Sequence, residues 1–279
     1  MAETTQIERE ALHLTTGDPL VVFDEVSIRF DEHEVLKSVS FKVQPGETRI
    51  ILGPAGCGKS VLMKLANGLI QPDEGTIWVF GERIDHAPEL SLYPMRAHVG
   101  MVFQESALFD SLTVRDNVGF RLEEEHVNPA EVTRRVSEAL RFVELEQAIE
   151  KYPSELSGGM RRRVSIARAI ISRPELILYD SPTGGLDPIT STTIVELVVK
   201  QRDVSHTTAL LITHRLQDAF TLATHRFNEA TGHMELIPNG GIEPSTKFLV
   251  LNEGKVVFDG STEELVHTKD SWLREYLTE

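Results

Sequence analysis

The stretch Gly53-Pro54-Ala55-Gly56-Cys57-Gly58-Lys59-Ser60 decides the fold of this chain. It fits the pattern G-x-x-x-x-G-K-[ST], and it lies between an apolar run at residues 48–52 and an amphipathic run at residues 61–69. That order predicts a strand, a glycine-rich loop and a helix. The glycines let successive backbone N–H groups form a nest for phosphate oxygens, and the helix N-terminus adds partial positive charge. We therefore expect the whole stretch to bind a nucleoside triphosphate, with Lys59 on the terminal phosphates and Ser60 on Mg²⁺.

Composition limits the class of protein and argues against one class of partner. The chain has 279 residues, and 28 Lys and Arg against 43 Asp and Glu give a net charge of −15. A surface this acidic disfavours nucleic acid, whose phosphates must be neutralised by basic side chains. No apolar run reaches the roughly 18 to 20 residues that span a bilayer, and the start Met1-Ala2-Glu3 lacks the features of a signal peptide. We therefore expect a cytoplasmic chain, with any membrane-spanning part supplied by another chain.

Hydrophobic periodicity predicts an α/β fold with a largely parallel sheet. Short apolar runs predict buried strands, and strands that alternate with helices favour a parallel sheet. Strands are expected at residues 20–30, 38–43, 48–52, 76–80, 176–179, 207–213, 247–251 and 255–259. The first two, joined by a turn at 31–34, predict a hairpin. Residues 1–18 predict a polar extension, and residues 88–171 are mostly helical. Further helices are expected at 61–69, with Leu65 and Leu69 on one face, and at 271–277.

A carboxylate follows one of the predicted buried strands. Asp180 comes directly after the apolar run Leu176-Ile177-Leu178-Tyr179. Ligands of open α/β sheets bind outside the carboxyl ends of the strands. Because Mg²⁺ prefers oxygen ligands, Asp180 is expected to hold the ion through water, as a partner to Ser60.

Five further segments, in a fixed order, resemble the ATP-binding cassette (ABC) ATPases. The matches are Phe30 at the aromatic that faces adenine, Gln104 at the Q-loop, Ser157-Gly158-Gly159 at the signature motif, Leu186-Asp187 at the D-loop and His214 at the switch histidine. The resemblance covers about residues 20–265. It implies a P-loop NTPase fold over residues 19–265, with a mixed or parallel sheet core, an N-terminal antiparallel β-subdomain and an inserted helical subdomain at about 88–172. Residues 266–279 then form a C-terminal helix, and Arg161 to Arg163 predict a solvated helix face.

The resemblance also implies how ATP is held. Two copies of the chain close head to tail around two ATP molecules. Each ATP contacts residues 53–60 of one copy and Ser157, Gly158 and Gly159 of the other, which supply a hydroxyl, open backbone donors and a helix N-terminus. Asp187 lines the same site. Gln104 senses Mg²⁺, and His214 contacts the γ-phosphate and the attacking water.

Within the family, residues 104–124 are similar to the Mla/Mce branch, whose ATPases serve phospholipid and lipid transport across the envelope of bacteria. That resemblance implies a membrane permease that contacts residues 105–120. Leu108 and Phe109 are the expected apolar contacts, with internal packing as the alternative. It also implies an Mce-type substrate-binding protein in the same complex and a peripheral position on the inner membrane.

Two features depart from the family pattern. Ser181 stands where the family has a glutamate that acts as general base or positions water, and a serine hydroxyl is far too weak a base. Losing a positioned base costs about 10²- to 10⁴-fold in rate, although phosphoryl transfer relies mainly on positioning and charge stabilisation. We therefore expect ATP binding and dimerisation with slow hydrolysis, His214 orienting the water. The second departure is an insertion at about 228–246, in which Asn239-Gly240 predicts a hairpin turn.

Two functions stay open at this point. The first is the ATPase subunit of a lipid-type ABC transporter. The second is a nucleotide-gated regulatory clamp with negligible hydrolysis, which Ser181 favours. A soluble ABC protein of DNA repair or translation is disfavoured by the charge of −15 and by the lack of tandem cassettes or long coiled coils. A P-loop kinase would lack Ser157-Gly158-Gly159.

Overall fold

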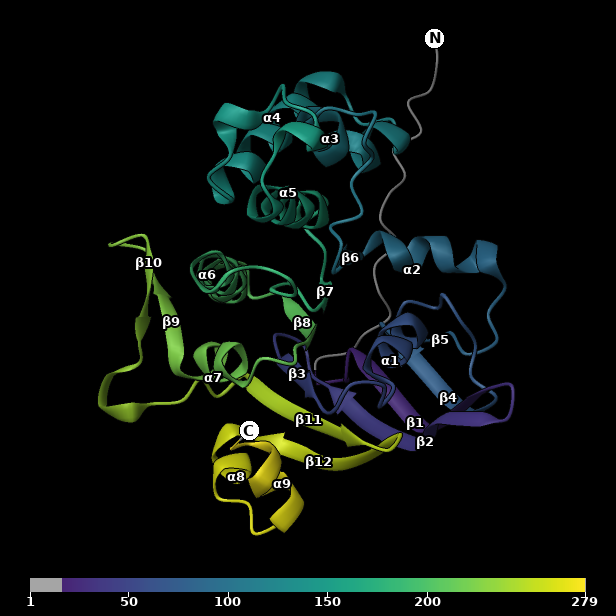
Figure 1. Ribbon diagram of the computed structural model, residues 1–279. Coiled ribbons are helices and arrows are strands. Elements are labelled where there is room, and N and C mark those ends of the chain that lie inside the picture. Colours follow the sequence, from purple (N-terminus) through teal and green to yellow (C-terminus); the bar gives the residue numbers. More distant parts are fainter. Residues whose placement is uncertain (1–16, 279) are drawn as a thin grey trace.

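The computed structural model describes residues 17–278, so the predicted extension at 1–18 lies almost entirely outside the described residues. The described part begins with an antiparallel sheet of order β2-β1-β4-β5 (Figure 1). Its strands are β1 (Val21–Phe30), β2 (His33–Val43), β4 (Glu74–Val79) and β5 (Glu82–Arg83). β1 pairs with β2 as the predicted hairpin, although β2 begins at His33 and the turn is confined to Asp31 and Glu32.

A six-stranded sheet of order β12-β11-β3-β8-β7-β6 forms the centre of the molecule. The neighbours β11, β3, β8, β7 and β6 run parallel, and β12 runs antiparallel to β11. The strands are β3 (Thr48–Leu52), β6 (Val99–Val102), β7 (Leu176–Asp180), β8 (Thr208–Ile212), β11 (Thr246–Asn252) and β12 (Lys255–Ser261). A mixed sheet core beside an N-terminal antiparallel sheet confirms the predicted fold class.

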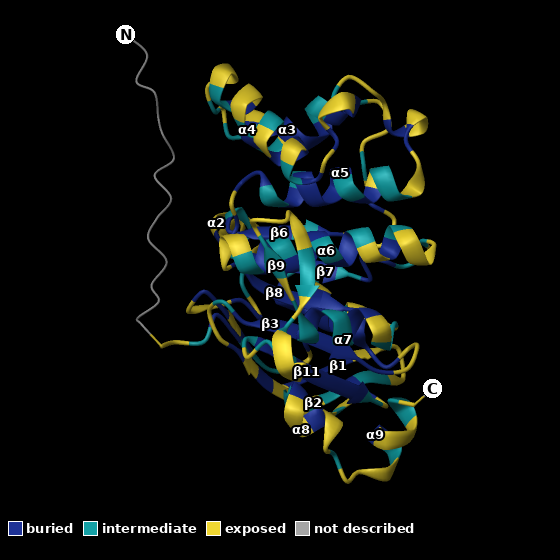
Figure 2. Ribbon diagram, turned by 90° about the vertical axis from the view of Figure 1, so that its left-hand side faces the viewer, coloured by how far each residue is buried: buried dark blue, intermediate teal, exposed yellow. Residues whose placement is uncertain are grey.

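Helices cover both faces of this central sheet (Figure 1). α3, α4 and α5 form a separate helical layer, and α6 and α7 lie between that layer and β11 (Figure 2). The helices are α1 (Lys59–Ala66), α2 (Tyr93–Ala97), α3 (Val114–Glu124), α4 (Pro129–Phe142), α5 (Gly158–Ile170), α6 (Pro188–Ser205), α7 (Leu216–Thr224), α8 (Thr262–Val266) and α9 (Ser271–Tyr276). Short 3₁₀ turns lie at Glu89–Leu92, Glu146–Ala148, Pro153–Glu155 and Pro238–Gly240.

The core is split in two by the central sheet. Ile50 and Leu52 of β3 point into a cluster with α3 to α7, whereas Ile51 points into a second cluster with α1 and the antiparallel sheet. Every residue of β3 is therefore buried. Burial on both faces explains why the sequence of a central parallel strand is a continuous apolar run rather than an alternating one.

The range 88–171 is mostly helical, as predicted, but it also contains β6, which pairs with β7 at the edge of the central sheet. Two local predictions are wrong. Helix α1 ends at Ala66, because Gly68 takes a φ of +63° that ends the helix; Leu69 lies beyond it and is 48% exposed. In the insertion, β9 (His225–Asn228) pairs with β10 (His233–Leu236) around Gly232, and Asn239-Gly240 lies in a 3₁₀ turn instead of the hairpin turn.

The described residues contain no helix that is both long enough and apolar enough to cross a membrane.

Candidate functional site

The register of the central sheet places the sequence motifs at its carboxyl edge. Ile51 of β3 pairs with Ile212 of β8, and Ile212 pairs with Asp180 of β7, so the three residues lie in one row across the sheet. The phosphate loop begins two residues after Ile51, and His214 follows Ile212 by the same interval. The parallel strands therefore bring the loop at 53–60, Asp180 and His214 to one edge, as the sequence predicts.

The Q-loop reaches the same edge through β6. Val102 of β6 pairs with Tyr179 of β7. Gln104 and Ser181 each lie two residues beyond this pair. The side chain of Gln104 passes close to Gly184, where an added Cβ would lie 3.4 Å from the Gln104 Cγ. Gln104 and the segment after Asp180 are therefore neighbours. The hydrophobic pattern of residues 88–171 did not indicate β6, the strand that positions Gln104.

The phosphate loop is shaped by its own glycines and its own lysine. Gly58, the N-cap of α1, has a φ of +102°, and a Cβ there would lie 2.5 Å from the Leu36 Cδ2. Lys59 is only 7% exposed, and its Nζ donates to the carbonyl oxygens of Gly53 and Pro54, both at 2.7 Å. The ammonium group is thus held against the loop by two of the loop's own carbonyl oxygens.

The β1–β2 hairpin lies next to this loop. Leu36 of β2 packs where a Gly58 side chain would stand, and Leu36 pairs with Ile28 of β1. Phe30 ends β1 two residues later and is 47% exposed. The hairpin therefore packs on the phosphate loop through Leu36 and carries an exposed aromatic ring at Phe30, whose contact with adenine stays a prediction.

The segment after β7 begins with Ser181, the position that departs from the family pattern in sequence. Ser181 is 3% exposed, has a φ of +48°, and its Oγ lies 3.4 Å from the Asp180 Oδ1. Three oxygen donors of the kind that Mg²⁺ prefers lie at this sheet edge. They are the Ser60 hydroxyl in the first turn of α1, the Asp180 carboxylate at the end of β7 and the Gln104 amide two residues after β6. The donor set therefore fits Mg²⁺.

The signature segment caps α5 and contacts a different part of the chain. The Ser157 Oγ accepts a hydrogen bond from the Met160 N–H at 3.2 Å. A Cβ on Gly158 would lie 3.6 Å from Leu186, and one on Gly159 would clash with the Thr190 side chain. The signature segment thus packs against the D-loop, while the phosphate loop packs against β2, so their contacts lie on separate segments of one chain.

Asp187 is engaged in capping α6. Its Oδ1 accepts from the N–H groups of Ile189 at 3.1 Å and Thr190 at 3.0 Å, and its Oδ2 accepts from the Thr190 hydroxyl at 2.5 Å. The hydrogen bond from the Thr190 hydroxyl is the largest effect that holds the pKa of Asp187 below its ordinary value. The carboxylate is therefore ionised and oriented by its own helix.

Arg162 is the main residue that sequence reasoning missed. It was predicted on a solvated helix face, but it is 4% exposed and its guanidinium donates to backbone carbonyls of two loops. The acceptors are Ser181 at 3.1 Å, Pro182 at 2.9 Å, Gly184 at 3.4 Å and Gln104. Burial lowers the pKa of Arg162. The sequence spacing could have indicated this burial. Arg162 lies three, four and seven residues before Ser165, Ile166 and Ala169, so it shares their buried face of α5.

A second buried contact holds the segment after β7 against α7. The Thr183 hydroxyl donates to the Asp218 Oδ2 at 2.6 Å, and both residues are buried. Nothing in the sequence indicated this pair, because the two residues are 35 positions apart.

The predicted permease-contacting region presents a pair of aromatic rings. Phe109 is 44% and Phe120 37% exposed, with ring centroids 4.8 Å apart. The buried Asn117 fixes the loop by bonding the Phe109 N–H at 2.8 Å and the Phe109 carbonyl at 3.0 Å. Leu108 is half-buried against the helical core. Phe109 is therefore a surface residue whose backbone is held by Asn117, while Leu108 packs partly inside.

A phosphate loop, an Asp-terminated strand, a Q-loop and a Ser-Gly-Gly helix cap on one α/β sheet define a nucleotide-binding cassette. The chain belongs to the ABC transporter family, whose model matches residues 36–184. It is 35% identical over 271 residues to "Protein TRIGALACTOSYLDIACYLGLYCEROL 3, chloroplastic" of Arabidopsis thaliana, covering 94% of this chain and 74% of that protein. It is 38% identical to the "Methionine import ATP-binding protein MetN" of Bifidobacterium longum over 72% of this chain, and there it spans about half of the relative, 52%.

A solved structure has the same architecture. The ATP-binding cassette MJ0796, a dimer in a post-hydrolysis state bound to ADP and Pi, superposes with a TM-score of 0.72 at 27% identity. The match covers 86% of this chain and 98% of that one. Family membership is thus shown by sequence and by fold. The more specific resemblance to the Mla/Mce branch is not shown, since relatives named for methionine, sulfate and polyamine import match as well.

Proposed function

We propose that this chain is the ATP-binding and ATP-hydrolysing subunit of a lipid-type ABC transporter, and that two copies close head to tail on a membrane permease. The observation that carries the proposal is the shared sheet edge, where residues 53–60, Asp180, Gln104 and His214 meet. The signature segment packs on Leu186 and Thr190 and the phosphate loop on Leu36, so we propose that the signature segment serves the ATP of a second copy. The dimeric relative bound to ADP and Pi supports the same arrangement.

The residues divide the work between binding and chemistry. Lys59 moves its ammonium group from the loop carbonyls to the terminal phosphates, and the backbone of residues 53–58 cradles them. Ser60, Gln104 and Asp180 would hold Mg²⁺, which neutralises charge on the phosphate oxygens when bound. His214, exposed after β8, orients the attacking water. Ser157 and Gly159 of the second copy face the γ-phosphate.

Lipid is the proposed cargo. A relative that covers 94% of this chain is named for trigalactosyldiacylglycerol, and residues 104–124 resemble the lipid-transport branch. A permease is proposed to dock on residues 105–120, where Phe109 and Phe120 are exposed. We further propose an Mce-type substrate-binding protein in the complex, and a position on the cytoplasmic face of the inner membrane.

Turnover by the purified chain tests the function. We expect the wild type to bind MgATP and to hydrolyse it slowly, because Ser181 provides no base. Ser181→Glu is expected to raise turnover by at least about 10²-fold, the lower end of the roughly 10²- to 10⁴-fold that a positioned base contributes. Lys59→Ala serves as the non-binding control. Wild-type turnover at the rate of fast ABC ATPases, unchanged by Ser181→Glu, would contradict the assignment to Ser181.

The alternative is a nucleotide-gated clamp, which Ser181 specifically favours. In that case MgATP drives dimerisation of the wild type, measured by light scattering, while Ser181→Glu leaves turnover at the background of Lys59→Ala.

Docking on a permease is tested separately. The tagged wild type should co-purify an integral membrane protein from its native membranes, and the double variant Phe109→Ser, Phe120→Ser should lose it. Tyr93→Ser, another exposed aromatic position, is the matched control.

A further inference from the structure

The C-terminal helix reaches back to the first residue of the phosphate loop. The Gly53 N–H donates a hydrogen bond of 2.9 Å to the Tyr276 Oη, across 223 positions of sequence. Tyr276 is the last residue of α9, a short helix that packs on the same core cluster as Leu52 of β3. A side chain from the end of the described chain therefore holds the point where β3 passes into the loop.

Gly53 needs a partner from outside the sheet. The ladder between β11 and β3 ends with the pair Val250 and Leu52, one residue before Gly53. Gly53 is buried, so an unpaired N–H there would be costly. Its φ of +142° excludes other residues, and a Cβ would clash with the Leu251 carbonyl oxygen. With its carbonyl bound by Lys59 and its N–H by Tyr276, Gly53 has both backbone groups fixed by side chains.

The Tyr276 hydroxyl is itself held in place. The ring stacks on Trp272 with centroids 5.4 Å apart and planes 6° from parallel. Leu273, 2% exposed, anchors α9 in the core. Asp270 caps the helix by accepting from the Leu273 N–H at 2.9 Å. The hydroxyl thus sits on a rigid support rather than on a frayed terminus.

We propose that Tyr276 is a positioning residue for the phosphate loop: by fixing the Gly53 N–H, it holds the loop in its nucleotide-binding shape. The proposal rests on the nucleotide site proposed above. A ligand binds more weakly to a protein whose competent conformation is only partly populated. Docking of α9 and affinity for a nucleoside triphosphate are therefore linked through one hydrogen bond.

The test compares Tyr276→Phe with the wild type in the full chain. This change removes the hydroxyl and keeps the ring that stacks on Trp272. We expect the dissociation constant for MgATP, measured by calorimetry, to rise about fivefold, which corresponds to about 1 kcal/mol. We also expect the Gly53 amide to exchange with solvent at least tenfold faster in the nucleotide-free protein, measured by NMR. Tyr93→Phe, at an exposed position on α2, should match the wild type in both measurements.

The two readouts separate a positioning role from a structural one. A lower melting temperature for Tyr276→Phe, with unchanged MgATP affinity and unchanged Gly53 exchange, would overturn the proposal. If the wild type itself does not bind MgATP, the proposed nucleotide site is wrong. Faster exchange of the Gly53 amide in Tyr276→Phe would then still support the proposal that Tyr276 fixes the phosphate loop, and unchanged exchange would refute it.

Discussion

Two loops at the same sheet edge are built in different ways. The loop at residues 53–60 follows β3, and the loop at residues 181–187 follows β7; both strands are central, parallel and buried. The first loop takes most of its shape from its own glycines and from Lys59, and one hydrogen bond from outside, to Tyr276, fixes its first residue. The second is held from outside, by Arg162 of α5 and by Asp218 of α7. A loop shaped from within can be recognised in a short motif, whereas a loop held from outside depends on the tertiary fold.

The first loop should be most sensitive at the residue with the least space. Gly53→Ala places a methyl group against the Leu251 carbonyl, at a φ that alanine avoids. We expect a loss of about 3 kcal/mol or more in the free energy of unfolding, since clash and backbone strain add. Gly56→Ala is the matched control, because Gly56 has a φ of +78° but nothing within 4 Å of an added Cβ.

For Gly56→Ala the expected loss is about 1 kcal/mol, from backbone conformation alone. Urea denaturation of both variants measures the difference. Equal losses would mean that the close approach of Leu251 adds nothing to the cost of the Gly53 backbone conformation, and the expectation for Gly53→Ala would be wrong.

The second loop should depend on Arg162 instead. Arg162→Met keeps much of the side-chain volume and removes every donor, leaving the carbonyls of Gln104, Ser181 and Pro182 without this partner. We expect unfolding to become easier by about 2 kcal/mol, because buried carbonyls lose their hydrogen bonds. Arg161→Met is the control, because Arg161 is exposed and its guanidinium donates to the Leu156 carbonyl at 2.6 Å.

That control should change the free energy of unfolding by less than about 0.5 kcal/mol. Similar effects of the two arginine variants would show that the second loop does not rely on the buried guanidinium. A change confined to Arg162→Met would confirm that α5 positions both the Q-loop and the segment at 181–187.

The contrast between the loops also explains what could be predicted from sequence. The strand-loop-helix at 48–66, the hairpin of β1 and β2 and the row containing Asp180 follow from local periodicity and were predicted. Strand β6 was missed because four residues give too short a pattern inside a helical region. Arg162 was misplaced because a charged side chain suggests solvent unless its acceptors, 19 to 58 residues away, are known. The Tyr276 contact with Gly53 has no local signal.

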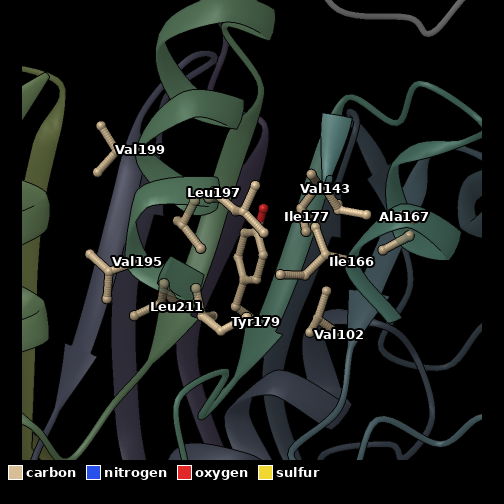
Figure 3. Packing of buried hydrophobic residues seen from close by; sticks show 14 of the residues in the cluster. Val102, Val143, Ile166, Ala167, Ile177, Tyr179, Val195, Leu197, Val199 and Leu211 are labelled. Atoms are coloured by element: carbon tan, nitrogen blue, oxygen red, sulfur yellow. The ribbon is translucent and has the colours of Figure 1, made fainter. Parts of the chain in front are cut away.

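The smallest expected effect concerns the strand that leads into the second loop. The Tyr179 hydroxyl is buried among Leu197, Ile166 and Val143 (Figure 3), and no residue within 17–278 accepts or donates a hydrogen bond to it. Burial accordingly raises the pKa of Tyr179. Tyr179→Phe keeps the ring and removes the desolvated hydroxyl, so we expect the free energy of unfolding to rise by about 1 kcal/mol.

Tyr276→Phe is the variant to compare with Tyr179→Phe, because it removes a hydroxyl that has a hydrogen-bond partner. Its free energy of unfolding should be equal to or lower than that of the wild type. If the second loop is held by Arg162 rather than by its strand, Tyr179→Phe should leave MgATP affinity unchanged. Parallel urea titrations and calorimetry on the two variants check both statements. A loss of stability in Tyr179→Phe would mean that the Tyr179 hydroxyl has a hydrogen-bond partner, such as a bound water between β7 and α6. Strand β7 would then help to position the second loop.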